Sequence, residues 1–144
     1  MIDFSLGTAE QKARGLNIGL SPGVYAGKSS HQGALYVSES AFIFLESSIK
    51  RHSIKYAKPY SHWGITEISR QEWNYIISDW QQLKEDVAAA TNAHELGVDL
   101  KELGREFNNG FEENKYALLT MIDQLIDWLH STLRTHEQVS ILGI

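Results

Sequence analysis

One segment of the 144-residue chain specifies its own secondary structure, and it constrains the fold more than any other. Ser69 is placed to cap the first turn of a helix, and Glu72 can bond back to the Ser69 amide. Ile68 can pack on Trp73 across this start. The sequence therefore predicts a helix from Ser69 to about Ala90. Its apolar residues recur at three- and four-residue steps and fall within a stripe roughly 120° wide: Trp73, Ile76, Ile77, Trp80, Leu83 and Val87.

A second long amphipathic helix is predicted later in the sequence, capped by Asn109 with Glu112 and running to about Thr135. Between the two, Asp99 with Glu102 predicts a cap for a short helix. Two long helices with a short connector are expected to pack face to face. The apolar residues of the second helix lie within roughly 60° of one line: Leu118, Leu119, Ile122, Leu125, Ile126, Leu129 and Leu133.

The first 60 residues carry weaker signals. Residues 1 to about 33 are rich in glycine and lack a helical period, so they predict loops with short strands near 24–26 and 34–37. Their glycines lack the spacing of a phosphate-binding loop. Residues 38–52 predict a helix, with a strand over 41–46 as the alternative. Residues 54–60 predict an extended segment because of Pro59.

The pattern predicts a mainly α fold, with α+β as the alternative. The architecture expected is a single domain, residues 1–144: an antiparallel helical bundle of two long amphipathic helices with a small irregular or β-containing N-terminal part. The chain contains no cysteine, which fits a reducing compartment. No signal peptide or membrane span is recognisable, so we expect a cytoplasmic protein.

The charge balance favours a protein partner over nucleic acid. Thirteen basic residues against eighteen acidic ones give a formal net charge of −5. Binding to a phosphate backbone requires clustered lysine and arginine, so nucleic acid is not expected as a direct ligand. An acidic protein is better suited to meet a basic protein, because complementary charge speeds and orients the encounter.

The outer side of the first long helix is the candidate partner-binding site. Tyrosine supplies rigid contact area in interfaces, and carboxylates around it favour arginine or lysine on a partner. The alternative is an ordinary solvated helix face with one tyrosine lying over a neighbouring element. Polar residues recur there at steps of four, three and four with one further acid beside them, and we call these five residues the acidic face: Tyr75, Asp79, Gln82, Glu85 and Asp86.

The second long helix carries two other candidates. Asp123, Asp127 and His130 form one row that could hold a divalent metal ion if another element supplied further ligands. The competing interpretation is a solvated face with ordinary ion pairs, and neither a metal nor another cofactor is expected. Met121 and Trp128 lie away from the main stripe. They predict packing against the N-terminal part, with a homodimer contact as the alternative.

The middle third of the chain resembles small bacterial immunity proteins, the partners of polymorphic or contact-dependent growth inhibition toxins. The resemblance spans residues 35 to about 83 and rests on Leu35-Tyr-Val-Ser-Glu39, on Tyr60-Ser-His-Trp-Gly-Ile-Thr-Glu-Ile-Ser69 and on Glu72-Trp73. It implies a cytosolic, non-enzymatic protein that binds one toxin domain, often by covering its active site with an acidic surface. Such proteins share no universal functional residues, so the resemblance assigns none here.

The expected function is therefore that of an immunity protein, or antitoxin, that neutralises a cognate toxin through the acidic face, with a basic nuclease as the expected partner. The loops before residue 60 are the alternative recognition surface. A second hypothesis is a small metal-dependent or ligand-binding enzyme that uses Asp123, Asp127 and His130. No recognisable catalytic motif supports an enzyme, and no catalytic residue is assigned.

Overall fold

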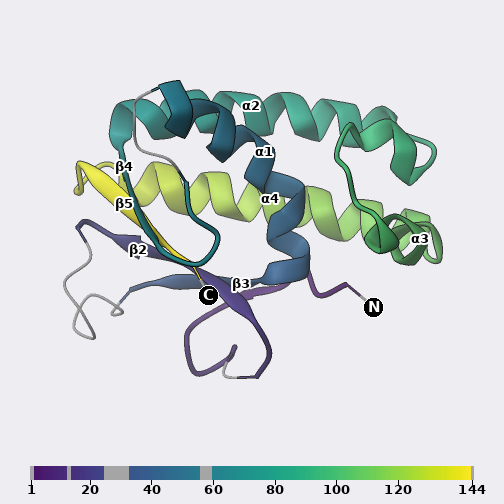
Figure 1. Cartoon of the computed structure of the whole chain (residues 1–144), viewed down its shortest axis with the longest axis horizontal. Helices are drawn as coiled ribbons and strands as arrows, with labels where there is room; N and C mark the ends of the chain where they lie inside the picture. The colour runs from purple at the N-terminus through teal and green to yellow at the C-terminus, as the bar shows by residue number, and fades with distance from the viewer. Residues whose placement is uncertain (1, 13, 25–32, 56–59, 144) are drawn as a thin grey trace.

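The chain folds as helices packed on one side of a β-sheet (Figure 1). The computed structural model describes residues 2–12, 14–24, 33–55 and 60–143, with the backbone alone at 53–55. The prediction of a mainly α bundle is wrong, because the described part of the chain is α+β with a five-stranded sheet. Its elements are β1 (Leu6–Gly7), β2 (Asn17–Pro22), β3 (Leu35–Ser38), α1 (Glu39–Lys55), β4 (Ile65–Ser69), α2 (Arg70–Ala89), the 3-10 helix η2 (Ala93–Leu96), α3 (Glu102–Asn108), α4 (Phe111–Thr132) and β5 (Gln138–Leu142).

The sheet has the strand order β1-β3-β2-β5-β4, and all of its neighbours are antiparallel. β5 lies between β2 and β4, where Ile141 is paired with Leu20 and with Thr66. Because side chains alternate between the two faces of a strand, this register gathers the large apolar residues on one face. They belong to the same buried core as the helices: Ile18, Leu20, Val37, Ile68, Val139 and Ile141.

The opposite face of the central strands carries small residues, which hides the strands in the sequence. Gly19, Ser21 and Ser140 are buried on this face. A Cβ atom at Gly19 would lie 2.7 Å from the ring of Tyr36, so only glycine fits under that ring. Since β2 and β5 are buried on both sides, they lack the apolar and polar alternation that marks a half-exposed strand. The sheet was therefore missed.

Of the helix predicted over residues 38–52, residues 39–52 are helical and Ser38 ends β3, and the strand considered over 41–46 does not form. Phe42, Leu45 and Ile49 are all fully buried on one side of α1. The helix extends to Lys55, so the extended segment predicted from residue 54 is wrong at its start, and residues 56–59 lie outside the described part. β3 confirms the strand predicted near 34–37. Of the strand predicted near 24–26, Val24 lies in a bend and the rest is outside the described residues.

α2 forms as its capping signals predict. The Glu72 amide donates to Ser69 Oγ and the Ser69 amide donates to Glu72 Oε1, each at 3.3 Å. Trp73 and Trp80 are completely buried. Their indole N–H groups donate to backbone oxygens, of Val139 on β5 at 3.1 Å and of Leu45 on α1 at 3.4 Å. The two tryptophans therefore attach α2 to both the sheet and α1.

The caps predicted for the later helices are wrong. Lys101, not Asp99, precedes α3, and Gly110, not Asn109, precedes α4; neither makes a side-chain cap bond. Asn114 helps to fix the start of α4. Its side-chain amide donates to the Phe107 backbone oxygen at 3.0 Å and so joins the end of α3 to the first turn of α4. α4 ends at Thr132, slightly earlier than predicted. Among the described residues, no helix is long and apolar enough to span a membrane.

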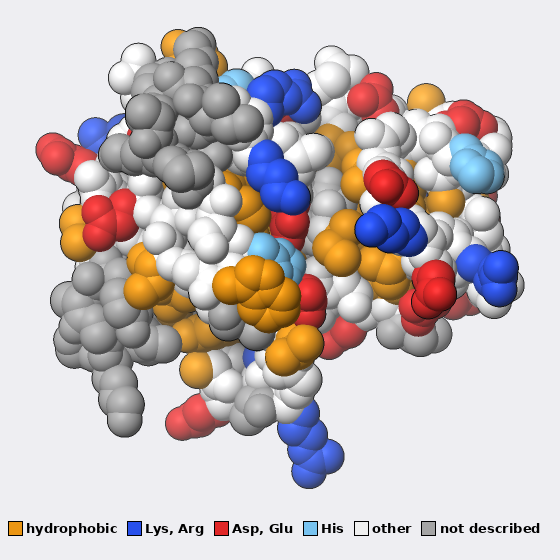
Figure 2. Space-filling model, in the orientation of Figure 1, with side chains coloured by type: hydrophobic (Ala, Val, Ile, Leu, Met, Phe, Trp, Pro, Cys, Tyr) orange, Lys and Arg blue, Asp and Glu red, His pale blue; other side chains and the backbone are white. Residues whose placement is uncertain are grey.

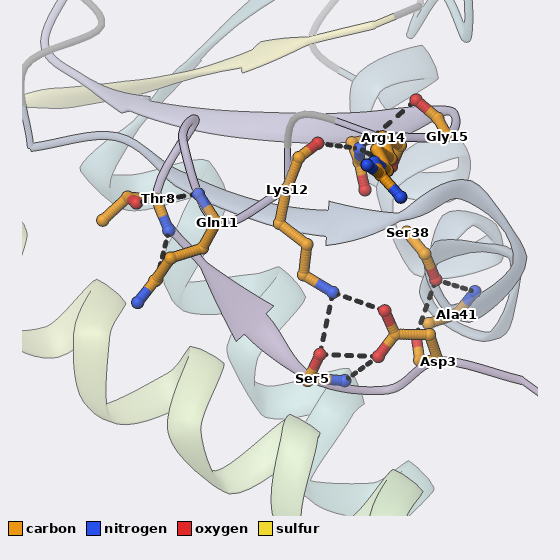
Figure 3. A network of polar contacts seen from close by, with 10 residues as sticks. Asp3, Ser5, Thr8, Gln11, Lys12, Arg14, Gly15, Ser38 and Ala41 are labelled. Carbon is orange, nitrogen blue, oxygen red and sulfur yellow. Dashed lines mark hydrogen bonds and ion pairs between the residues drawn. The ribbon is translucent and has the colours of Figure 1, made fainter.

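A small polar network fixes residues 2–5 beside the start of α1 (Figure 3). Lys12, whose side chain is only 8% exposed, donates to Asp3 Oδ2 at 2.7 Å and to Ser5 Oγ at 2.8 Å. Ser38 Oγ donates to the Asp3 backbone oxygen at 2.6 Å. Burial raises the pKa of Asp3, but the hydrogen bonds from Lys12 and Ser5 outweigh this effect and lower the pKa to about 2.

The lowered pKa of Asp3 makes this network dependent on pH. Its contribution to the free energy of unfolding is complete above the unfolded pKa of about 3.9 and is lost as the pH falls toward 2. The Asp3 side chain is 57% exposed, so solvent screening reduces the contribution to about 0.5–1 kcal/mol. We expect Asp3→Asn to lower stability by that amount at pH 6 in urea unfolding, with the difference shrinking between pH 4 and pH 2. Asp127→Asn, at an exposed position, is the control; a constant difference for Asp3→Asn across this range would contradict the assignment.

Candidate functional site

The acidic face is directed outward along α2. Tyr75 is 41% exposed, and Gln82, Glu85 and Asp86 are also exposed. The Tyr75 ring stacks on His52 of α1, with ring centroids 5.7 Å apart and an angle of 18° between the ring planes. This stacking holds the tyrosine ring against α1. Four of the five predicted residues are therefore available to a partner.

Asp79 has a different position in the same row. Its Oδ2 lies 2.9 Å from His52 Nε2 and 3.2 Å from Arg51 Nη1, and the Asp79 side chain is 25% exposed. It therefore joins α2 to α1, and Arg51 compensates its charge. The negative charge that the acidic face can offer a partner comes mainly from Glu85 and Asp86.

Part of the acidic face borders a hollow of about 230 Å³ between α1 and α2, which we call the α1–α2 hollow. Asp79, Gln82 and Asp86 form its α2 side, and Gln82 Nε2 donates to Asp86 Oδ1 at 3.2 Å. The other side is formed by α1 and by the segment that follows η2. The spacing on α2 predicted which residues share a face, but it gave no sign that α1 would complete a concave surface beside them.

A second constellation, which sequence reasoning missed, lies on the other half of α1. We call Glu39, Glu46, Tyr60 and His62 the His62 cluster. His62 Nδ1 is 2.6 Å from Glu46 Oε1, and His62 Nε2 is 3.0 Å from Glu39 Oε1. The space-filling view shows a histidine, acidic side chains and a large hydrophobic side chain meeting over α1 in the middle of this face (Figure 2). Glu46 is the most buried carboxylate of the cluster, at 7% exposure, and Lys50 lies 3.5 Å from its other oxygen.

The hydrogen bonds of the His62 cluster hold the turn before β4 against α1. A carboxylate only accepts hydrogen bonds, so the imidazole donates to both partners when both of its nitrogens carry hydrogen. Both ring nitrogens are thus directed at carboxylates of α1. Burial, followed by the charges of Glu46 and Glu39, raises the pKa of Tyr60 well above its ordinary value. The Tyr60 hydroxyl therefore keeps its proton and donates to Glu46 Oε1 at 3.4 Å.

The His62 cluster presents Trp63 to solvent. Trp63 is 68% exposed and packs its ring edge-on against His62, with centroids 5.0 Å apart. Gly64 closes the turn by donating its amide to the Ser61 oxygen at 3.3 Å. The seven-residue spacing of Glu39 and Glu46 could have shown that they share a side of α1. No sequence pattern indicates that His62 folds back between them.

The predicted metal row on α4 does not converge with other ligands. Asp123, Asp127 and His130 are all exposed, and Asp123 pairs with Lys84 of α2. Within the described ranges, no group of three or more histidine, aspartate or glutamate side chains is arranged to hold a metal ion. A catalytic metal requires ligands and a shaped, largely dry pocket. Because its three side chains are exposed, this row lacks a dry pocket, and no further ligand from the described residues joins it.

The second seam of α4 is occupied within the same chain. Met121 is completely buried, and Trp128 is partly buried and packs on the core. Met121 also borders a shallow groove beside Phe4 and Leu6, which agrees with the predicted packing against the N-terminal part. Met121 is therefore not accessible for the homodimer contact considered from the sequence, and only the exposed part of Trp128 is available for one.

No family model matches the chain, and neither a curated protein nor a solved structure matches it.

Proposed function

We propose that the chain is a non-enzymatic immunity protein that acts in the cytoplasm by binding a cognate toxin domain, with a basic nuclease as the expected partner. The observation that carries the proposal is the open position of the acidic face, where Tyr75 is braced by His52 beside exposed carboxylates. A braced aromatic side chain loses little conformational freedom on binding, which favours affinity. The net charge of −5 favours the encounter with a basic domain.

The proposal is tested by protection from a toxin. The toxic domain encoded by a neighbouring gene would be expressed with and without this chain, and growth and the affinity of the purified pair would be measured. We expect growth to be restored and a stable complex to form. A neighbouring toxin that neither binds the chain nor is neutralised by it would overturn the proposal.

Charge reversal tests the assigned surface. We expect Glu85→Lys with Asp86→Lys to weaken toxin binding about tenfold or more at low salt, because the exposed negative charge of the acidic face becomes positive. The effect should diminish as salt is added. We choose this pair because Asp79 also joins α2 to α1, so reversing it would disturb folding. Affinity is measured by calorimetry at two salt concentrations.

The matched control is Glu112→Lys with Glu113→Lys in the first turn of α4, where two exposed neighbouring acids undergo the same change in net charge. We expect this variant to bind nearly as tightly as the unmodified protein. Equal weakening in both variants would mean that overall charge, and not the acidic face, determines binding. Circular dichroism verifies that both variants remain folded.

A further inference from the structure

The α1–α2 hollow contains polar groups whose hydrogen bonding is incomplete. Ser48 on α1 is only 5% exposed, yet it borders the hollow. Its hydroxyl has no hydrogen-bond partner within the described ranges of the chain. Among the described residues, the one buried side-chain atom without a partner is Gln138 Oε1, so the Ser48 oxygen is reached by solvent through the hollow. A polar group that enters the hollow from solvent can therefore form a hydrogen bond with the Ser48 hydroxyl.

The charges of the hollow favour a cation. Arg51 is paired with Asp79 at 3.2 Å, so these two charges compensate each other. The carboxylate of Asp86 remains, and from the described residues it receives only the amide of Gln82, at 3.2 Å. A carboxylate accepts several hydrogen bonds, so Asp86 has free capacity for a donor group. The hollow therefore has an uncompensated negative charge with the Ser48 hydroxyl on the opposite side.

The shape and the walls of the hollow favour one long cationic side chain. A volume of about 230 Å³ is below the roughly 300–1,000 Å³ of ordinary small-molecule pockets. Leu83, Leu96 and Val98 form apolar walls. The methylene groups of arginine or lysine pack along such walls while the charged end makes hydrogen bonds. The planar guanidinium also loses less hydration and can bond a carboxylate with two donors, which favours arginine.

We propose that the α1–α2 hollow receives an arginine side chain of a protein partner, with its guanidinium on Asp86 and Ser48 and its stem along Leu83 and Val98. That the arginine belongs to a protein partner rests on the proposed function. The ability of the hollow to bind a guanidinium does not depend on it. The hollow thus adds a specific anchoring point to the broad attraction of the acidic face.

The binding test uses N-acetyl-arginine amide as the probe and nuclear magnetic resonance of the full chain as the readout. We expect saturable shifts of the backbone amides of Ser48, Gln82 and Gly97 at millimolar probe concentration. N-acetyl-citrulline amide, which has a similar shape and no charge, should bind at least about tenfold more weakly. Absence of these shifts, equal binding of the citrulline probe, or the same saturable shifts with inorganic phosphate would overturn the proposal.

Three variants separate the hollow from its surroundings. We expect Asp86→Asn to weaken binding of the arginine probe about tenfold, and Ser48→Ala to weaken it several-fold. Glu85→Gln removes the same charge from the neighbouring position, which does not border the hollow, and it should change affinity by less than about twofold. Equal effects of Asp86→Asn and Glu85→Gln would refute a specific site.

The two proposals fail in different ways. Toxin binding that is insensitive to Asp86→Asn and Ser48→Ala would overturn the role of the hollow but not the immunity function. A chain that binds the arginine probe but no toxin would overturn the immunity function but not the guanidinium site.

Discussion

Trp73→Ala is expected to lower the free energy of unfolding by about 3–5 kcal/mol, the range for removing a large buried aromatic side chain. Trp73 is completely buried between α2 and the sheet, and its indole donates to the Val139 oxygen at 3.1 Å. The substitution leaves a cavity and also leaves the Val139 oxygen without this donor. Because domains of this kind have a total stability of about 5–15 kcal/mol, the loss would bring the protein close to unfolding.

Trp63→Ala provides the matched control. Trp63 is 68% exposed, so the same substitution there should change stability by only about 0.5 kcal/mol. Urea unfolding monitored by circular dichroism measures both variants. If Trp73→Ala fails to fold, Trp73→Phe retains most of the volume and should cost about 1–2 kcal/mol through the lost hydrogen bond and the reduced contact. Similar losses for Trp63→Ala and Trp73→Ala would contradict the packing described above.

Glu46→Ala should have the second largest effect, a loss of about 2–4 kcal/mol. Glu46 is 7% exposed as a whole residue, and its carboxylate accepts hydrogen bonds from His62 and Tyr60. Removing a buried carboxylate leaves its polar partners without a bond, which costs more than the net energy of the interaction itself. The loop that carries Trp63 should then detach from α1. Hydrogen exchange of the Gly64 amide, which donates to Ser61, should become faster together with the loss of stability.

Glu39→Ala tests whether burial accounts for this effect. Glu39 contacts the other nitrogen of the same imidazole at 3.0 Å, but its side chain is 26% exposed, against 10% for Glu46. Water can replace the lost partner more easily at Glu39, so we expect a cost of about 1 kcal/mol or less. A loss in Glu46→Ala no greater than in Glu39→Ala would rule out the buried carboxylate as the main anchor of the loop.

Local signals explain what could be predicted from the sequence. The start of α2 is predictable because Ser69 and Glu72 act within a single turn, and the stripe containing Trp73 and Trp80 repeats over about four turns of one helix. The acidic face followed from the same period. Its exposure is as predicted, except that Asp79 turns toward α1.

Non-local pairing explains what could not be predicted. The strands are two to six residues long, and a short apolar run such as that of β5 does not identify its neighbours. The glycine-rich start of the chain predicts mainly loops, although Gly19 belongs to a strand and is glycine because Tyr36 lies across it. The His62 cluster joins residues from α1 and from the turn before β4. Its geometry exists only after the sheet has placed that turn beside the helix.

The interior position of β5 makes the joining of β4 to the rest of the sheet depend on a segment late in the sequence. Ser140 of β5 donates to the Gly23 oxygen across 117 residues of sequence, so this strand docks only after a very long loop has closed. Until it docks, β2 and β4 each present an unpaired edge that can join to another chain. We therefore expect folding to be slow and all-or-none, and nascent or shortened chains that lack residues 138–142 to aggregate.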